Sequence, residues 1–432
     1  MINTDLLTTL ILDQQQIIQR LELIHRNFHF EQNMNYVLVG LRRAGKSFLL
    51  FQRVKELLQM GVKLEQIIYI NFEDERLVDF KLANFNEIIV AANQITPQKH
   101  YYFFDEIQNI DGWEHFARRM ADQKEQVYIT GSNSKMLGKD ISMRLGGRYL
   151  TKYVAPFSFA EYLTAKQLPH TKVDLLSSAT LGQVNAALQT YLQYGGLPEA
   201  INLQDKRSYL NNLYQNIYLA DIIVRNQIRN PAALRTMISK IAETVMHELS
   251  YPKLTNAVKS VGISTSRTSM IEYTENVQSA YLLFNTKNYF SKFAERESIP
   301  RYYFTDNGLL NIFLVNKSAA LLENLVANYL FNHYQNELYY LKSNQTGIDV
   351  DFYLPQTQTA IQVTWTMHGP AREREIANLV TLGQHFTEAQ KLLIITKNDP
   401  AEVIKQSGVT IQSLPLIKFL LADRENGDEF GL

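Results

Sequence analysis

Short apolar runs alternate with amphipathic segments over the first third of the chain. The runs lie at about residues 36–39, 67–72, 101–104, 127–130 and 149–154, and each has the length of a buried strand. The segments between them carry apolar residues every three or four positions, as one face of a helix does. Strands that alternate with helices form a parallel sheet covered on both faces. We therefore predict that residues 1–155 form a doubly wound α/β domain.

The pattern changes after residue 155. Residues 156–235 are mostly segments of helical period, which predict a helical lid. Residues 236–317 predict a helix, a turn at "SVGIS", a second helix capped by Ser264 or Thr265, and an apolar strand, the order of a winged helix-turn-helix. Residues 318–432 predict a helix, three strands, a helix and a strand, and thus a second α/β domain.

Composition narrows the classes of partner. The chain holds 43 Lys plus Arg and 43 Asp plus Glu, so no overall field attracts nucleic acid or anionic lipid, and any anion site must be local. The absence of cysteine excludes disulfides, thiolate metal sites and a cysteine nucleophile, and fits a reducing compartment. The first predicted helix lacks a basic leader, and no apolar run reaches the roughly 18 residues of a spanning helix. We expect a soluble cytoplasmic protein without a membrane partner.

A glycine-rich motif follows the first predicted strand and ends where an apolar helix begins. It fits the pattern G-x-x-x-x-G-K-[ST], and its residues are Gly40, Leu41, Arg42, Arg43, Ala44, Gly45, Lys46 and Ser47. A tight turn would explain the glycines, and a solvated charge would explain Lys46. The latter fits poorly, because a cation at a helix N-terminus faces the positive end of the helix dipole. A bound phosphate removes the conflict, so we predict that the loop binds ATP, with Lys46 on the terminal phosphates and Ser47 on Mg²⁺.

Two adjacent carboxylates end the third predicted strand, "KHYYFFDEIQNI". In a phosphate-loop enzyme such a pair places one acid, here Asp105, on Mg²⁺ and the next, Glu106, beside the attacking water. An acidic boundary between a strand and a loop is the plainer alternative. After a phosphate loop, the pair favours hydrolysis of the nucleotide.

Two further features are open to more than one interpretation. Ser132 and Asn133 follow the fourth predicted strand, where they could sense the γ-phosphate or cap the next helix. Arg148 follows two glycines before the fifth strand, where it could act as an arginine finger, in cis or from a neighbouring chain of a homo-oligomer, or be a surface arginine.

Together these motifs resemble the AAA-superfamily ATPases of prokaryotes that are fused to domain of unknown function 4143. The likeness rests on "GLRRAGKS", "INFEDERL", "FFDEIQNIDGWEHFARRM", "ITGSNSKML" and "LGGRYLTKYVAPFSFAEYL", and it continues into "YLQYGGLPEAI", "YFTDNGLLN" and "ENLVANYLFNHY". It implies the same roles for Lys46, Ser47, Asp105 and Glu106, a sensor at Ser132 or Asn133, and a finger at Arg148.

The C-terminal segment resembles the restriction-endonuclease-like nucleases in its order of elements. That likeness implies metal-binding acids at Glu323 and Asp351, but the acid-x-lysine of the third strand reads Gln362-Val363-Thr364 here. Asp349 lies on the same strand face as Asp351, and Lys391 on a later strand is a candidate substitute for the missing lysine. We expect a degenerate nuclease fold, kept for binding or assembly, that does not cleave DNA with Mg²⁺ or Mn²⁺.

Two functions remain open at the level of sequence. In the first, Mg²⁺-dependent ATP hydrolysis moves DNA-binding or nuclease-like accessory domains in nucleic-acid processing. The helix-turn-helix would contact DNA through Arg267 and its neighbours, with Lys253 and Lys259 upstream. These few basic residues form a thin electrostatic footprint, which favours the alternative that the fold packs against protein. In the second, the chain is a slow nucleotide-controlled switch that acts on a protein partner in signalling or regulation.

Overall fold

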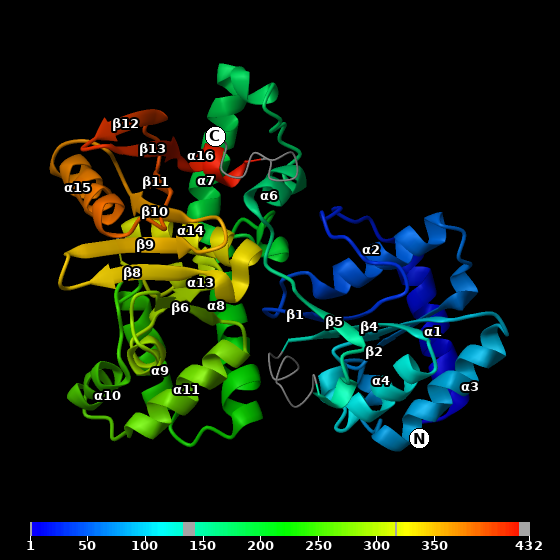
Figure 1. Cartoon of the computed structure of the whole chain (residues 1–432). Coiled ribbons are helices and arrows are strands. Elements are labelled where there is room, and N and C mark those ends of the chain that lie inside the picture. Colours follow the sequence, from blue (N-terminus) through cyan, green and yellow to red (C-terminus); the bar gives the residue numbers. More distant parts are fainter. Residues whose placement is uncertain (1, 133–142, 316–317, 423–432) are drawn as a thin grey trace. The chain divides into compact units, whose positions relative to one another are not determined.

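The computed structural model describes residues 2–132, 143–315 and 318–422 (Figure 1). The chain divides into two compact units. The first holds residues 1–155 together with 279–281, and the second holds residues 156–278 and 282–432.

The first unit is built on a five-stranded parallel sheet. Its strands are β1 (Asn35–Val39), β2 (Ile67–Asn71), β3 (Tyr101–Asp105), β4 (Gln126–Gly131) and β5 (Tyr149–Tyr153). Their order across the sheet is β2-β3-β4-β1-β5. All neighbouring pairs are parallel, so the carboxyl ends of β1, β3 and β4 meet at one edge. This confirms the predicted doubly wound α/β domain.

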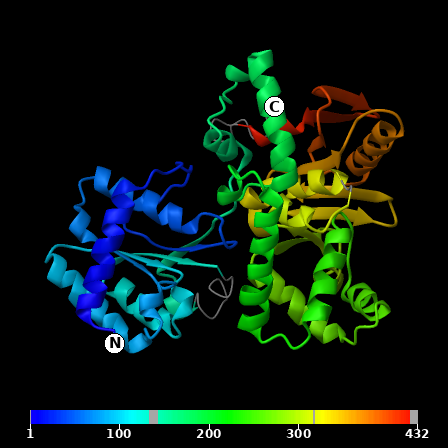
Figure 2. The ribbon, with the colours of Figure 1, turned by 180° about the vertical axis from the view of Figure 1, so that it is seen from behind.

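Helices lie on both faces of this sheet. They are α1 (Thr4–Arg20), α2 (Lys46–Gln59), α3 (Phe85–Ile95) and α4 (Trp113–Asp122). Helix α1 packs against α3 and β2 and crosses one face of the sheet, as its dark blue ribbon shows (Figure 2). Aromatic side chains fill the core between sheet and helices; Tyr36, Phe103 and Tyr128 are fully buried and stack on one another. The rigid core fixes the edge at which the strands end.

The second unit combines helices with an eight-stranded sheet. Its helices are α6 (Phe159–Ala165), α7 (Ser178–Tyr194), α8 (Lys206–Asn216) with a π-helical continuation (Ile217–Val224), α9 (Pro231–Glu243), α10 (Tyr251–Ser260), α11 (Arg267–Ser279), α12 (Phe293–Ser298), α13 (Asn307–Asn311), α14 (Ser318–Tyr334), α15 (Pro370–His385) and α16 (Leu416–Leu420). Its strands are β6 (Leu283–Asn288), β7 (Arg301–Phe304), β8 (Tyr339–Ser343), β9 (Ile348–Leu354), β10 (Thr359–Thr364), β11 (Lys391–Thr396), β12 (Glu402–Gln406) and β13 (Val409–Pro415). The strand order is β12-β13-β11-β10-β9-β8-β6-β7.

The strand predicted as part of a winged helix-turn-helix belongs to this sheet. The pattern correctly predicts α10, the turn and α11, but β6 pairs with β8 as well as with β7. Apart from residues 279–281, the residues predicted as three separate domains thus lie within one compact unit. The cap of α11 also differs from the prediction, because the Ser266 hydroxyl, rather than Ser264 or Thr265, accepts the Ser269 N–H at 3.0 Å.

A buried aspartate ties the helical segment to the rest of this unit. The Asp306 carboxylate accepts the backbone N–H of Gly196 at 2.8 Å and that of Gly308 at 2.8 Å. Asn307 donates to the carbonyls of Leu192 and Leu321. These contacts make "YGGLPEA" a junction between α7 and α13, in which the residues of "YGG" and "DNG" contact one another.

Among the residues that the structure describes, no helix is both long enough and apolar enough to cross a bilayer.

Candidate nucleotide-binding site

The predicted phosphate loop lies between the carboxyl end of β1 and the first turn of α2. A side chain at Gly40 is excluded, because a Cβ there would lie 2.2 Å from the Val154 carbonyl oxygen. Gly45 caps α2 with a left-handed φ of 98°, which glycine adopts without strain. Leu41 and Ala44 are buried, whereas Arg43 is exposed. The loop therefore presents its backbone, and the N–H groups of the first turn of α2, to the carboxyl edge of the sheet.

Lys46 is the first residue of α2 and is buried. Its Nζ atom donates to the carbonyl oxygens of Gly40 at 3.2 Å and Leu41 at 3.1 Å, and it lies 3.7 Å from Glu106 Oε1. The side chain thus folds back over its own loop. A buried ammonium group needs polar partners, and the two carbonyl oxygens supply them here. Phosphate oxygens of a bound nucleotide could replace these carbonyl oxygens as partners of Lys46.

Asp105 ends β3 and is held by side chains of two neighbouring strands. Tyr69 of β2 donates to Oδ2 at 2.7 Å, and Thr130 of β4 donates to Oδ1. Burial and the adjacent Glu106 charge raise the pKa of Asp105, although hydrogen bonds from Thr130, Tyr69 and the Ser47 hydroxyl oppose that shift. A cation beside Asp105 would favour its ionised form, so the carboxylate and the Ser47 hydroxyl are a fitting pair of oxygen ligands for Mg²⁺.

Glu106 follows in the left-handed region, with φ at 52°. Such a conformation is strained for a residue with a side chain, and it is held by the hydrogen bond from the Glu106 N–H to Thr130 Oγ1 at 2.9 Å. Burial alone would raise the pKa of Glu106, but the Lys46 ammonium group, the hydrogen bond from Gln108 and the charge of Arg42 together hold it below its usual value. The two adjacent acids therefore have pKa values displaced in opposite directions, with Glu106 ionised at neutral pH and able to accept a proton.

Of the two sensor candidates, only Ser132 lies within the described residues. The Ser132 hydroxyl is buried and interacts with the Glu106 carboxylate, whose pKa it helps to lower. This places Ser132 beside the second acid at the carboxyl edge of the sheet. Asn133, the other candidate, lies outside the described residues.

Arg148 lies at the opposite edge of the sheet from the phosphate loop. Tyr149 pairs in register with Asn35, so Arg148 stands beside the amino end of β1, about 13 Å or more from the loop at about 3.3 Å per residue. Its guanidinium bonds Asp122 at the end of α4 at 2.5 Å and donates to the Gly146 carbonyl at 3.2 Å. The prediction of a finger acting in cis is therefore wrong, because a residue that precedes a parallel strand lies at the edge away from the ligand site.

Several residues of the site are missed by motif matching. Tyr69 and Thr130 position Asp105, Gln108 donates to Glu106, and Arg42 of the loop pairs with Glu73 at 3.2 Å. A signal for the first two exists in the sequence. Each carries a hydroxyl group on a strand that neighbours β3, Tyr69 in the middle of β2 and Thr130 near the carboxyl end of β4.

A second cluster of polar residues lies in the other unit. Glu323 of α14, Asp349 and Asp351 of β9, and Gln362 of β10 line one cavity, so the structure brings together the residues that the nuclease resemblance singled out. Lys391 does not join them. It pairs in register with Thr359, three residues before Gln362 along β10, and is exposed. The proposed substitute for the missing lysine is therefore wrong.

The fold and the phosphate loop define a P-loop domain of the AAA class. A family described as "AAA domain" matches residues 32–163, and a family described as "Domain of unknown function (DUF8612)" matches residues 185–320. The second match differs from the domain of unknown function 4143 that the resemblance implied, and the restriction-endonuclease-like fold stays a prediction.

Full-length relatives establish the family. The chain is 32% identical to "Uncharacterized protein MJ1544" of Methanocaldococcus jannaschii over 402 residues, which cover 90% of this chain and 88% of that protein. It is 27% identical to an "Uncharacterized protein" of Haemophilus influenzae over 366 residues, 83% of this chain and 88% of that protein. The chain belongs to the same family as MJ1544.

Solved structures with AAA-type cores are more distant. The Orc1 protein of Aeropyrum pernix in complex with DNA is 15% identical, with a TM-score of 0.29 over 69% of this chain and 88% of that one. AMPPCP-bound DnaA of Aquifex aeolicus is 14% identical, with a TM-score of 0.24 over 57% of this chain and 81% of that one. Likenesses at this level do not establish a shared architecture across the chain.

Proposed function

We propose that the chain binds ATP with Mg²⁺ and hydrolyses it at the carboxyl edge of the first sheet. The observation that carries this proposal is the convergence of Lys46, at the start of the helix that follows β1, with Asp105 and Glu106 at the end of β3, a strand that does not neighbour β1 in the sheet. Each group suits one role. Lys46 offers a cation to phosphate, Asp105 offers a ligand to a metal ion, and Glu106 offers an ionised acid that can accept a proton from water.

Each residue has a chemical role in this proposal. The loop N–H groups and Lys46 hold the phosphates, and Lys46 exchanges its bonds to the Gly40 and Leu41 carbonyls for bonds to phosphate oxygens. Ser47 and Asp105 would hold Mg²⁺, which would supply positive charge to the phosphates. Glu106 accepts the proton of the attacking water.

The helix-turn-helix supplies the nucleic-acid part of the proposal. Lys253, Lys259, Arg267 and Thr268 are exposed on α10 and α11. Three basic side chains can bind phosphates and place α11 near base edges, although they form a small basic surface. On this view ATP hydrolysis moves the second unit on nucleic acid.

A different observation favours a nucleotide switch with a protein partner. A cavity of about 870 Å³ in the second unit is lined by apolar side chains that include Leu175, Leu181, Ile417 and Leu421. Val173 and Leu176 are strongly exposed beside it. Adjoining apolar residues on a surface are typical of protein interfaces rather than nucleic-acid ones.

An ATPase assay separates these alternatives. Turnover is measured with and without duplex DNA on protein of known oligomeric state, with Lys46→Ala as the inactive reference and Arg267→Ala as the matched surface variant. Stimulation by DNA that is lost in Arg267→Ala supports nucleic-acid processing. Slow turnover that is indifferent to DNA supports the switch, and turnover equal in wild type and Lys46→Ala contradicts both.

A further inference from the structure

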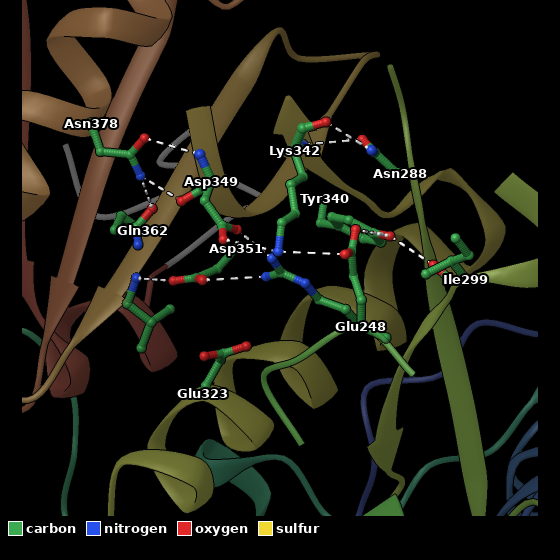
Figure 3. Close-up of polar contacts among 12 residues, drawn as sticks. Glu248, Asn288, Ile299, Glu323, Tyr340, Lys342, Asp349, Asp351, Gln362 and Asn378 are labelled. Atoms are coloured by element: carbon green, nitrogen blue, oxygen red, sulfur yellow. Dashed lines mark hydrogen bonds and ion pairs between the residues drawn. The ribbon is translucent and has the colours of Figure 1, made fainter. Parts of the chain in front are cut away.

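A cavity of about 640 Å³ in the second unit gathers four carboxylates. They come from three elements: Glu323 on α14, Asp349 and Asp351 on β9, and Glu375 on α15. Figure 3 shows Glu323, Asp349 and Asp351 on the sides of one polar cluster, with Gln362 and Asn378 next to Asp349. Convergent carboxylate and amide oxygens are the ligands that hard divalent cations such as Mg²⁺ and Mn²⁺ take in proteins.

The cation among these carboxylates is a side chain of the protein itself. Arg301 begins β7, and its side chain is only 2% exposed. One guanidinium nitrogen bonds the Asp349 carboxylate, another lies 3.5 Å from Asp351 Oδ1, and the group stacks over the Tyr340 ring at 4.4 Å. Tyr303, on the same face of β7, donates to Glu323 Oε1 at 2.9 Å. Strand β7 therefore supplies two residues to the acidic centre.

The guanidinium is not saturated by these contacts. Its Nε and Nη1 atoms are buried and make no hydrogen bond within the described part of the chain. Arg301 lines the cavity, so a buried, incompletely bonded cation faces the same space as the carboxylates. A guanidinium group carries five N–H donors, and an arginine whose role was hydrogen bonding alone would use more of them.

The other two cations of the cluster pair at its rim. Lys342 bridges Glu248 and Asp349 at 3.4 and 3.3 Å, and Arg374 pairs with Glu375 while staying 74% exposed. Neither takes the interior position.

We propose that Arg301 is the resident cation of this acidic centre and fills the space in which Asp349, Asp351 and Glu323 would otherwise hold a divalent metal ion. The proposal is independent of the proposed ATP hydrolysis. It agrees with the finding that, in the part of the chain that the structure describes, no three acidic or histidine side chains are grouped to hold a metal. The guanidinium contacts both Asp349 and Asp351, so its positive charge takes the position that a metal ion would take between these two acids. The native centre is thus closed to metal, and it opens when Arg301 is removed.

Binding of Mn²⁺ to the full chain without nucleotide tests this proposal. The wild type and Asp351→Asn are expected to bind Mn²⁺ equally weakly. Arg301→Ala is expected to bind at least about tenfold more tightly, because metal affinity follows the number of charged ligands available. The gain is expected to disappear in the double variant Arg301→Ala/Asp351→Asn. Neither substitution lies in the first unit, so any Mn²⁺ binding there is the same in all variants.

Two results would overturn the proposal. The first is that the wild type binds Mn²⁺ and Asp351→Asn does not. Mn²⁺ would then bind at Asp351 while Arg301 is still present. The other is a folded Arg301→Ala that gains no binding. If Arg301→Ala does not fold, Arg301→Gln, which keeps polar contacts without the charge, replaces it with the same expected gain and the same contradiction.

Discussion

The two units each bury one basic side chain beside acidic ones, but they hold it differently. In the first, Lys46 contacts two carbonyl oxygens of its own loop and stands 3.7 Å from Glu106. In the second, Arg301 binds Asp349, approaches Asp351 and stacks on Tyr340. Carbonyl oxygens are neutral partners that a phosphate can replace, whereas two carboxylates and an aromatic face bind a guanidinium firmly. The first arrangement can exchange its partner for a ligand, and the second uses its cation as part of the fold.

The largest effect on stability is expected from Arg301→Met, which keeps the apolar stem and removes the charge. Breaking a buried ion pair on one side costs about 3–5 kcal/mol, because the Asp351 carboxylate stays buried without its cation. Without the guanidinium the pKa of Asp351, which burial already raises, rises further above its unfolded value, so the lost stability is regained as the pH falls and this carboxyl is protonated. Urea unfolding at pH 5 and pH 8 measures this.

Arg374→Met is the matched control, since Arg374 lines the same cavity but is exposed. It is expected to cost less than Arg301→Met, because the Arg374 guanidinium is exposed even though its partner Glu375 is buried. Equal losses in the two variants, or a loss for Arg301→Met that does not depend on pH, would contradict the assignment of Arg301 as the interior cation.

The corresponding change in the first unit, Lys46→Ala, is expected to weaken ATP binding. A charge-assisted bond to a phosphate contributes about 1.5–3 kcal/mol, which corresponds to roughly 10- to 100-fold in Kd. Calorimetric titration with a non-hydrolysable ATP analogue measures it. Lys99→Ala, an exposed lysine just before β3 at the far edge of the sheet, is the control. Unchanged affinity in Lys46→Ala would remove the lysine from the phosphate site.

A smaller, pH-dependent effect is expected at the buried junction of the second unit. Burial raises the pKa of Asp306 to about 6, against an ordinary value of 3.8, even though three backbone N–H groups donate to it. Because the folded value is the higher one, the contribution of this carboxyl to stability is fully present below about pH 4 and is lost as the pH rises through 6. The change is about 3 kcal/mol.

Asp306→Asn should remove this part of the pH dependence. Unfolding free energies of wild type and variant are compared between pH 4 and pH 7, where the other acids titrate in both proteins alike. Parallel curves would show that Asp306 has an ordinary pKa in the folded chain.

The smallest effect is expected from Arg148→Ala. The Arg148–Asp122 pair lies at the surface and at the edge away from the phosphate loop, so its loss should change stability by no more than about 1 kcal/mol and leave ATP hydrolysis nearly unchanged. A loss of about 10³-fold, with activity restored by mixing Lys46→Ala and Arg148→Ala chains, would instead place Arg148 in the site of a neighbouring chain.

Local pattern was enough to predict the first unit. All five strands lie within one or two residues of their predicted positions, because a buried parallel strand is a short apolar run with helical segments on either side. The phosphate loop and the Asp105–Glu106 pair follow from the same logic, since residues just after parallel strands meet at one edge.

Features that depend on pairing across the chain were not predicted. The strand β6 was assigned to a winged helix, because no local signal shows that it pairs with β8 some fifty residues later. Arg301 was not recognised for the same reason: β7 is short and remote in sequence from β9, and only the sheet brings the two together. Arg148 was placed at the site by its glycines, although its position before a strand, rather than after one, indicated the other edge.

The central claim, that Glu106 activates water for ATP hydrolysis in the first unit, is tested most directly by single-turnover hydrolysis in Glu106→Gln. The amide keeps the shape of the side chain but cannot accept the proton, so the rate is expected to fall by about 10²- to 10⁴-fold while bound ATP is retained. Gln108→Ala, which removes only a hydrogen-bond donor to Glu106, is the reference for a merely positional change. Equal single-turnover rates in wild type and Glu106→Gln would contradict the account.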